Sequence, residues 1–156
     1  MFIKFREDCI RDVELDDFKV LLSNLSPDDE KDMTVWKGDS KEETLFDLYE
    51  GSDRVLSIIS GQYGLVAIVG YKIRPGGKSC EMWLVTTNSI NQVGKRFLIL
   101  SSHFFKKLLT RFDYIVGYVD ATNQKRIKFI RFCKGKFTGN NITVQNGDTY
   151  LEFIIN

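Results

Sequence analysis

The part of the sequence that most constrains the fold is residues 54–86, where β-rich runs alternate with strong turn signals. Arg54–Gln62 and Leu65–Ile73 are rich in β-branched residues, and Gly61-Gln62-Tyr63-Gly64 between them is typical of a hairpin turn. A second turn is predicted at Arg74-Pro75-Gly76-Gly77-Lys78, followed by a third strand over Cys80–Thr86. Three strands joined by short turns form an antiparallel meander, so the chain must be built around a sheet.

Helical patterns come before the meander. Apolar residues at helical spacing predict a helix over Leu15–Leu25. Ser26-Pro27-Asp28-Asp29 combines an N-cap serine, a proline at the first helical position and acidic residues in the first turn, which indicates a second helix. Ser40-Lys41-Glu42-Glu43 is a capping box that opens a third helix. The side chains expected to face inward from that third helix are Leu45, Phe46 and Tyr49.

Helix and strand patterns alternate after the meander. The predicted elements are an amphipathic helix over Gln92–Phe112, a strand over Asp113–Asp120, a basic helix over Asn123–Cys133 closed by Gly135 at its C′ position, and a hairpin of Lys136–Val144 with Thr149–Ile155. With an extended Met1–Val13 in front, the order is β-ααα-βββ-α-β-α-ββ. This order predicts an α+β fold, with a mixed, mostly antiparallel sheet of about seven strands, helices on both faces, and one domain over residues 1–156.

Composition narrows the possible classes. Apolar residues make up 43% of the chain and charged residues 28%, the balance of an ordinary globular protein. Cys9, Cys80 and Cys133 are widely spaced and form no CxxC pair, so we expect no metal site and a reducing compartment. We expect no membrane segment, because no apolar run is long enough to span a bilayer.

Charge is distributed unevenly along the chain. Residues 1–50 carry fifteen acidic and seven basic side chains, whereas residues 51–156 carry six acidic and fifteen basic ones. A basic half can bind phosphate-bearing partners such as CoA or nucleic acid, or it can pair with the acidic half within one fold. Basic and aromatic residues interleave over residues 123–136, which makes nucleic-acid binding by this helix one hypothesis.

The element order and several motifs resemble the GNAT (N-acetyltransferase) superfamily. Ile10–Leu21 is similar to its first strand and leucine-rich helix, and Trp83-Leu84-Val85 is similar to the end of its central strand. The superfamily then has a loop of pattern Arg/Gln-x-x-Gly-x-Gly/Ala, whose backbone N–H groups hold the CoA pyrophosphate at a helix N-terminus. Asn91–Arg96 stands at that place here. If CoA binding is retained, the resemblance implies that the cofactor-binding residues are Val85, Gly94, Lys95, Arg96 and Asn123.

Two elements depart from the superfamily pattern. Gly94 matches the loop, but Arg96 stands where a small residue is expected, and Ile130 stands where the superfamily has a tyrosine that protonates the leaving thiolate. An active enzyme would therefore need other catalytic residues, for which Glu81 and Tyr118 are the candidates. A cleft filled by Arg96 would favour a binding role, whereas an open, amide-lined cleft would favour an enzyme.

A narrower resemblance is to a small GNAT-like protein that short-tailed (podovirus) phages encode near their internal virion proteins. Trp83–Thr87, Asn123–Phe137 and Tyr150–Ile155 carry this resemblance. It implies a non-catalytic phage protein without a cofactor, which acts in virion assembly or binds a host factor, in the host cytoplasm or packaged in the virion. The alternatives are an acetyl-CoA-dependent N-acetyltransferase that modifies a host amine, and a nucleic-acid-binding module that uses the helix at 123–136.

Overall fold

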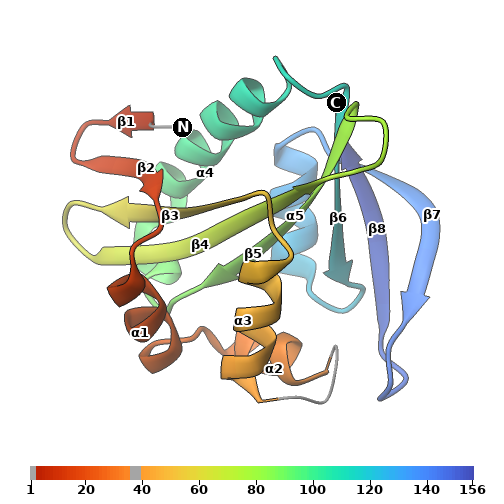
Figure 1. The fold of residues 1–156 in the computed structure, drawn as a ribbon, viewed down its shortest axis with the longest axis horizontal. Helices are drawn as coiled ribbons and strands as arrows, with labels where there is room; N and C mark the ends of the chain where they lie inside the picture. The colour runs from red at the N-terminus through yellow and green to blue at the C-terminus, as the bar shows by residue number, and fades with distance from the viewer. Residues whose placement is uncertain (1–2, 36–39) are drawn as a thin grey trace.

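Eight strands form one mixed sheet in the computed structural model, and helices cover both of its faces (Figure 1). The structure describes residues 3–35 and 40–156. The strands are β1 (Ile3–Phe5), β2 (Asp8–Asp12), β3 (Arg54–Ser60), β4 (Gly64–Ile73), β5 (Ser79–Thr86), β6 (Tyr114–Asp120), β7 (Lys136–Thr143) and β8 (Thr149–Ile155). The helices are α1 (Leu15–Ser23), α2 (Pro27–Val35), α3 (Lys41–Glu50), α4 (Ile90–Leu108) and α5 (Gln124–Phe132). The predicted α+β class is confirmed.

The strand order in the sheet is β1-β2-β3-β4-β5-β6-β8-β7, and every neighbouring pair is antiparallel except β5 with β6. The sheet has one strand more than the seven expected, because the N-terminal segment is a hairpin rather than one extended element. Arg6 adopts a positive φ of 57°, which reverses the chain so that Phe5 pairs with Asp8 and Ile3 with Ile10. Met1 and Phe2 lie outside the described residues.

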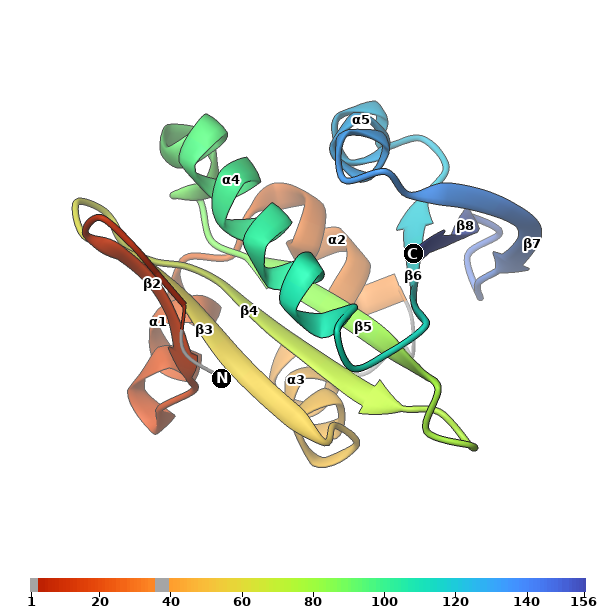
Figure 2. The same cartoon turned by 90° about the horizontal axis from the view of Figure 1, so that it is seen from above.

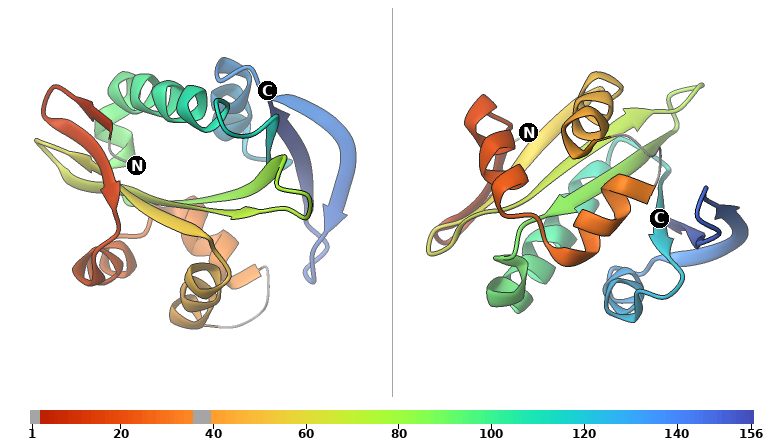
Figure 3. Two further views of the ribbon diagram at one scale, coloured as in Figure 1. Left: turned by 45° about the horizontal axis from the view of Figure 1, so that its top comes forward. Right: turned by 90° about the horizontal axis from the view of Figure 1, so that it is seen from below.

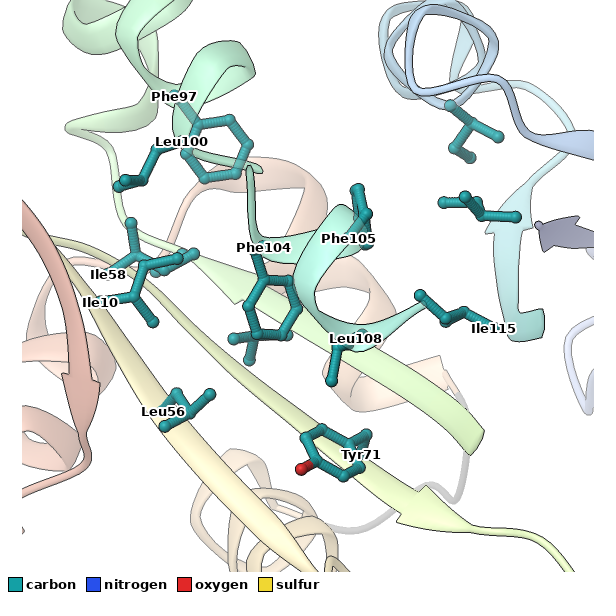
Figure 4. Close-up of a cluster of buried hydrophobic side chains, with 14 of the residues drawn as sticks. Ile10, Leu56, Ile58, Tyr71, Phe97, Leu100, Phe104, Phe105, Leu108 and Ile115 are labelled. Carbon is teal, nitrogen blue, oxygen red and sulfur yellow. The ribbon is translucent and has the colours of Figure 1, made fainter. Parts of the chain in front are cut away.

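The helices divide between the two faces of the sheet. Helices α4 and α5 lie side by side on one face, and α1, α2 and α3 cover the other (Figures 2 and 3). Helix α4 buries Leu100, Phe104 and Leu108 in the larger of two apolar clusters, together with Ile10, Leu56 and Tyr71 from the strands (Figure 4). None of the described helices is long and apolar enough to cross a membrane.

Three apolar side chains on the predicted buried faces of the helices are exposed instead: Leu15, Phe46 and Tyr49, the last of which is 43% exposed. Leu15 is 76% exposed, because it is the first residue of α1 after the Glu14 N-cap and points away from the sheet. Phe46 is 62% exposed, because α3 packs through Leu45 and through Thr44, whose hydroxyl donates to the Met33 carbonyl of α2. The predicted N-cap of α3 is confirmed, since the Ser40 hydroxyl accepts a hydrogen bond from the Glu43 N–H.

The end of α5 differs from the prediction in one residue. Gly135 was expected at the C′ position, but Lys134 takes the left-handed conformation there, with φ 64°. Gly135 follows it and donates its N–H to the Ile130 carbonyl at 2.8 Å, which completes a Schellman motif. A Cβ at Gly135 would lie 2.4 Å from Ile130 Cγ2, so glycine is needed here for close packing.

A buried carboxylate at the start of α1 predicts a pH dependence of stability. Asp17 accepts bonds from the Arg11 guanidinium at 2.8 and 3.0 Å, from Ser57 Oγ at 2.7 Å and from the Glu14 N–H at 2.8 Å. Burial raises the pKa of Asp17, but these hydrogen bonds outweigh burial and hold it below its ordinary value of 3.8. Asp17 therefore contributes stability that is fully present above that value and is lost as the pH falls through the folded-state pKa.

We expect Asp17→Asn to lower the free energy of unfolding by about 2 kcal/mol at neutral pH, since it removes a hydrogen-bonded charge. The difference from the wild type should shrink as the pH falls below about 4. Urea unfolding at several pH values measures it. Asp16→Asn is the matched control, because Asp16 is exposed and its ion pair with Lys19 spans 3.7 Å. A constant difference at all pH values would contradict this account.

Candidate functional site

A cleft opens in the sheet where β5 and β6 part. The parallel pairing of these strands joins only Ser79 with Tyr114, Cys80 with Ile115 and Glu81 with Val116. Both strands continue beyond this pairing, and the space between them belongs to a cleft of about 610 Å³ that is also lined by α4, α5 and β8. Open α/β sheets bind ligands at places of this kind, at the carboxyl ends of parallel strands.

The cleft reaches both faces of the sheet. Met82 and Leu84 of β5 pack on the side of α4, whereas Trp83 packs on the side of α1, and all three line the cleft. On β6, Val119 belongs to the α4 cluster, and the preceding residue, Tyr118, also lines the cleft. Since successive side chains of a strand point to opposite faces, one ligand could approach from each side of the sheet.

The edge of β5 supplies backbone hydrogen-bonding groups to the cleft. The Thr86 N–H donates to Asp29 at 2.8 Å and the Thr86 carbonyl accepts from the Ser26 N–H at 3.0 Å, so this edge faces away from β4. The Thr87 N–H points the other way, to the Val66 carbonyl of β4. Because backbone groups alternate along a strand, Met82 and Leu84 direct theirs toward the cleft, beyond the last β5–β6 pair. An extended ligand could pair with this edge as an added strand would.

The first turn of α4 forms one end of the cleft. Helix α4 is kinked at Gly94 (φ 17°, ψ −96°), which lines the cleft together with Ile90 and Asn91. A Cβ added at Gly94 would meet nothing within 4 Å, so open space lies in front of it. The N–H groups of Ile90, Asn91 and Gln92 already donate to the carbonyls of residues 87–89, but the positive end of the helix dipole still favours an anion here.

Cations of α5 face this end of the cleft. Lys125, Arg126 and Lys128 line it, and Lys125 Nζ donates to Asn91 Oδ1 at 2.9 Å. The first turns of α4 and α5 therefore lie next to each other. Lys125 and Lys128 are exposed, so their charges are available to a ligand with phosphate groups.

Arg126 is tied to α2 rather than to the open cleft. Its Nη2 lies 2.6 Å from Asp29 Oδ2, and its Nη1 lies 3.4 Å from Asp32 Oδ2. Burial lowers the pKa of Arg126, but the charge of Asp29 and its hydrogen bond outweigh burial and leave the pKa raised. Asp29 also accepts a hydrogen bond from Thr86. It therefore connects α2 to both sides of the cleft, to β5 through Thr86 and to α5 through Arg126.

A hydroxyl and a carboxylate lie together at the cleft on β6 and β8. Tyr118 donates from its Oη to Glu152 Oε2 at 3.0 Å, and Glu152 accepts a second bond from Thr138. Burial, and then the bond to Glu152, raise the pKa of Tyr118. The bond from Thr138 contributes most to lowering the pKa of Glu152. At neutral pH this pair is thus a protonated phenol beside an ionised carboxylate.

The residues predicted as a site are only partly brought together. Gly94 and Tyr118 line the cleft, and so does Ile130 at the position of the missing acid. Val85 is buried on the side of α1, although its neighbours Leu84 and Thr86 line the cleft. Glu81 and Lys95 are exposed and are not among the lining residues.

Two further predicted residues have other partners. Arg96 does not fill the cleft, because its Nε lies 3.0 Å from Asp8 Oδ2 at the start of β2. Asn123 is the N-cap of α5, with its side chain accepting from the Arg126 N–H at 3.1 Å and donating to Asp28 at 3.1 Å. It lines a smaller, polar pocket of about 290 Å³ beside the cleft.

Sequence reasoning missed two groups at this site. The edge of β5 at Met82 and Leu84 was not singled out, because a strand sequence does not show where its neighbour departs. Lys125 and Lys128 were noted only as part of a nucleic-acid surface. The sequence feature that could have identified them is a basic helix, α5, directly after β6, the strand that pairs with β5.

Among comparisons with known proteins, only those with solved structures give a match. No family model matches the sequence, and no curated protein matches it significantly. Solved structures match over almost the whole chain, and their fold is that of GNAT-family acetyltransferases. The chain has this fold.

Three of these structures show the extent of the similarity. An acetyltransferase (GNAT family) from Bacillus anthracis superposes with a TM-score of 0.72 at 16% identity, covering 99% of this chain and 98% of that one. A spermidine N-acetyltransferase from Vibrio cholerae, in complex with CoA and spermine, gives 0.70 at 14% identity, covering 97% and 96%. A ribosomal-protein-S5-alanine acetyltransferase from Vibrio fischeri gives 0.68 at 11% identity, covering 99% and 95%.

Proposed function

We propose that this protein is an acyl-CoA-dependent N-acyltransferase, with acetyl-CoA as the simplest donor. The observation that carries the proposal is the cleft that passes through the sheet where β5 and β6 diverge. A transferase must bring two substrates together, and this opening gives each of them its own face of the sheet. The similar structures described above are acetyltransferases, and one of them holds CoA.

The groups in the cleft fit a CoA thioester. The first turn of α4 and the exposed Lys125 and Lys128 suit its phosphates. The backbone edge at Met82 and Leu84 suits the amide groups of its pantetheine arm, which would pair with β5 as a strand does. A CoA thioester would supply an activated acyl group in this cleft.

The reaction is the transfer of an acyl group to an amine. The amine nitrogen forms a bond to the acyl carbon and loses a proton, while the carbon–sulfur bond breaks and the sulfur gains a proton. Tyr118 keeps its proton at neutral pH and can also accept a hydrogen bond through its oxygen. We assign it the role of orienting the amine, with the ionised Glu152 holding the phenol in place. A backbone N–H at the edge of β5 is suited to stabilise negative charge on the acyl oxygen.

A non-catalytic role is the rival, and Ile130 is the observation that favours it. Ile130 lines the cleft where the resemblance expects a tyrosine, and its side chain cannot donate a proton. Two features favour the transferase over this rival: the cleft is open to a ligand, and Arg96 lies outside it. The phage assembly role and nucleic-acid binding by residues 123–136 stay predictions. Arg126, one of the bases of that helix, is already engaged by Asp29 and Asp32.

Titration calorimetry with CoA tests the binding half of the proposal. We expect Lys125→Ala and Lys128→Ala each to weaken CoA binding about fivefold at low salt, since each removes one charge next to the phosphates. Lys106→Ala is the matched control, because Lys106 is an exposed lysine in the last turn of α4 and does not line the cleft. Equal losses for all three lysines would contradict the assignment.

Release of free thiol from acetyl-CoA in the presence of amines tests the catalytic half. Thiol release that depends on the amine supports the transferase. CoA binding without thiol release for any amine would retain the cleft as a CoA site and favour the non-catalytic role. Absence of CoA binding would overturn the proposal.

A further inference from the structure

The residues that line the cleft are polar and basic at one end and apolar at the other. Asn91 and Lys125 line the cleft at the first turns of α4 and α5, and Lys128 lines it one turn farther along α5. Farther along α4, the lining residues are Phe97, Leu98 and Phe105, all of them apolar. Phe97 and Phe105 are eight residues apart, so this apolar part of the cleft extends for about 12 Å along the helix.

Helix α5 and strand β8 also contribute apolar side chains to this end of the cleft. The later lining residues of α5 are Phe129, Ile130 and Phe132, and β8 contributes Phe153 and Ile155. The rings of Phe97 and Phe129 approach to 5.5 Å between centroids, which joins α4 and α5 across the cleft. In the close-up of the core, Phe105 lies on the side of α4 that faces β6 and Ile115, whereas Phe104 points toward the strands β3 and β4 (Figure 4).

An acetyl group does not account for this apolar end. Its single methyl group would contact only a few of these side chains, and large apolar surfaces that face a cleft are usually matched by an apolar ligand. Cations at one end and aromatic and aliphatic side chains at the other are complementary to a ligand with an anionic head and an apolar tail. A fatty acyl thioester of CoA has this form.

We infer that the cleft selects an acyl donor with a medium-length hydrocarbon chain, such as octanoyl-CoA, rather than acetyl-CoA. The CoA phosphates lie at the first turns of α4 and α5, and the hydrocarbon chain lies among Leu98, Phe105 and Ile155. This inference rests on the proposed function, and it adds the class of acyl group that is transferred. The acyl carbon then forms its bond to the amine nitrogen as its bond to sulfur breaks, with the same proton balance as for acetyl transfer.

Binding of CoA, acetyl-CoA, octanoyl-CoA and octanoyl-pantetheine, measured by calorimetry without an amine present, tests the inference. Each methylene that becomes buried should strengthen binding about fourfold. We therefore expect octanoyl-CoA to bind the wild type at least tenfold more tightly than acetyl-CoA. The ratio of the two affinities is taken within each variant, so a general change in CoA affinity cancels.

Leu98→Trp is the blocking variant, because Leu98 lines the cleft but is only half-buried, so a larger side chain there does not disturb the main core. Ile99→Trp is its matched control, since Ile99 is 39% exposed on the same helix and does not line the cleft. We expect the ratio to fall to about one in Leu98→Trp and to stay at its wild-type value in Ile99→Trp. Thermal unfolding verifies that both variants are folded.

The outcomes separate this inference from the proposed function. Equal binding of acetyl-CoA and octanoyl-CoA by the wild type would overturn the inference and leave the proposed function standing. An unchanged ratio in Leu98→Trp would overturn the place assigned to the chain. If CoA does not bind but octanoyl-pantetheine does, the apolar site is supported and the proposed function fails. If neither binds, both fail.

Discussion

Replacing Gly94 with tryptophan is expected to abolish CoA binding, with a loss of about a hundredfold or more, equivalent to about 2.7 kcal/mol. Gly94 lines the cleft at the kink that follows the first turn of α4, and a Cβ there would meet nothing within 4 Å. An indole at this position would therefore extend into the space that the phosphates need, without displacing neighbouring side chains. Titration calorimetry with CoA measures the loss, and thiol release from acetyl-CoA should fall in parallel.

The neighbouring residue provides the control. Lys95 is exposed, lies on the same turn and does not line the cleft, so Lys95→Trp adds the same side chain outside the site. We expect Lys95→Trp to retain CoA binding within about threefold. Thermal unfolding should show that both variants are folded. Normal CoA affinity in folded Gly94→Trp would show that the ligand does not use the first turn of α4.

Replacing Asp29 with alanine is expected to cost about 3–5 kcal/mol of folding free energy, because it leaves the Arg126 charge without its main partner. Asp29 is 2% exposed and accepts from Thr86 N at 2.8 Å, from Ser26 Oγ at 3.0 Å and from Arg126 Nη2 at 2.6 Å. For a chain of this length the loss corresponds to a fall in Tm of roughly 10 °C. Urea unfolding and thermal unfolding, both followed by circular dichroism, measure the effect.

Asp28→Ala is the matched control for this change. Asp28 precedes Asp29 in the same first turn of α2, but it is exposed, and it accepts a hydrogen bond from Asn123 at the surface. We expect it to cost less than about 1 kcal/mol. Similar costs for the two variants would show that the bonds of Asp29 across the opening contribute little to stability.

The Asp29 network also connects stability with the site. Asp29 links β5, through Thr86, to α5, through Arg126, so it ties together the two sides of the cleft. Asp29→Ala should therefore weaken CoA binding even at temperatures at which the protein is folded. The acidic pair Asp28-Asp29 was assigned to the start of a helix from the sequence, and α2 does begin there. Its contacts with Thr86 and Arg126, far along the chain, carry no signal in the local sequence.

The part of the site at the start of α4 could be predicted from the sequence, because it lies in one short segment of the chain. Gly94 was identified through the resemblance of Asn91–Arg96 to the GNAT pyrophosphate loop, and it lines the cleft. For Arg96, which stands where the loop pattern has a small residue, the sequence left two alternatives: it could occupy the ligand's space or contribute to cofactor binding. Its ion pair is instead with Asp8, which follows the Arg6 turn of the N-terminal hairpin. That turn was not recognised, so the partner of Arg96 could not be foreseen.

The order of helices and strands follows from the local sequence, because hydrophobic periodicity, helix caps and glycine-rich turns act over a few residues. The local sequence placed the meander at residues 54–86, the capped start of α3 at Ser40 and the C-terminal hairpin over residues 136–155. The divergence of β6 from β5 after three paired residues has no such local signal, since the pairing joins residues 35 positions apart in the chain. That departure opens the cleft, exposes the β5 edge and brings Lys125 against Asn91.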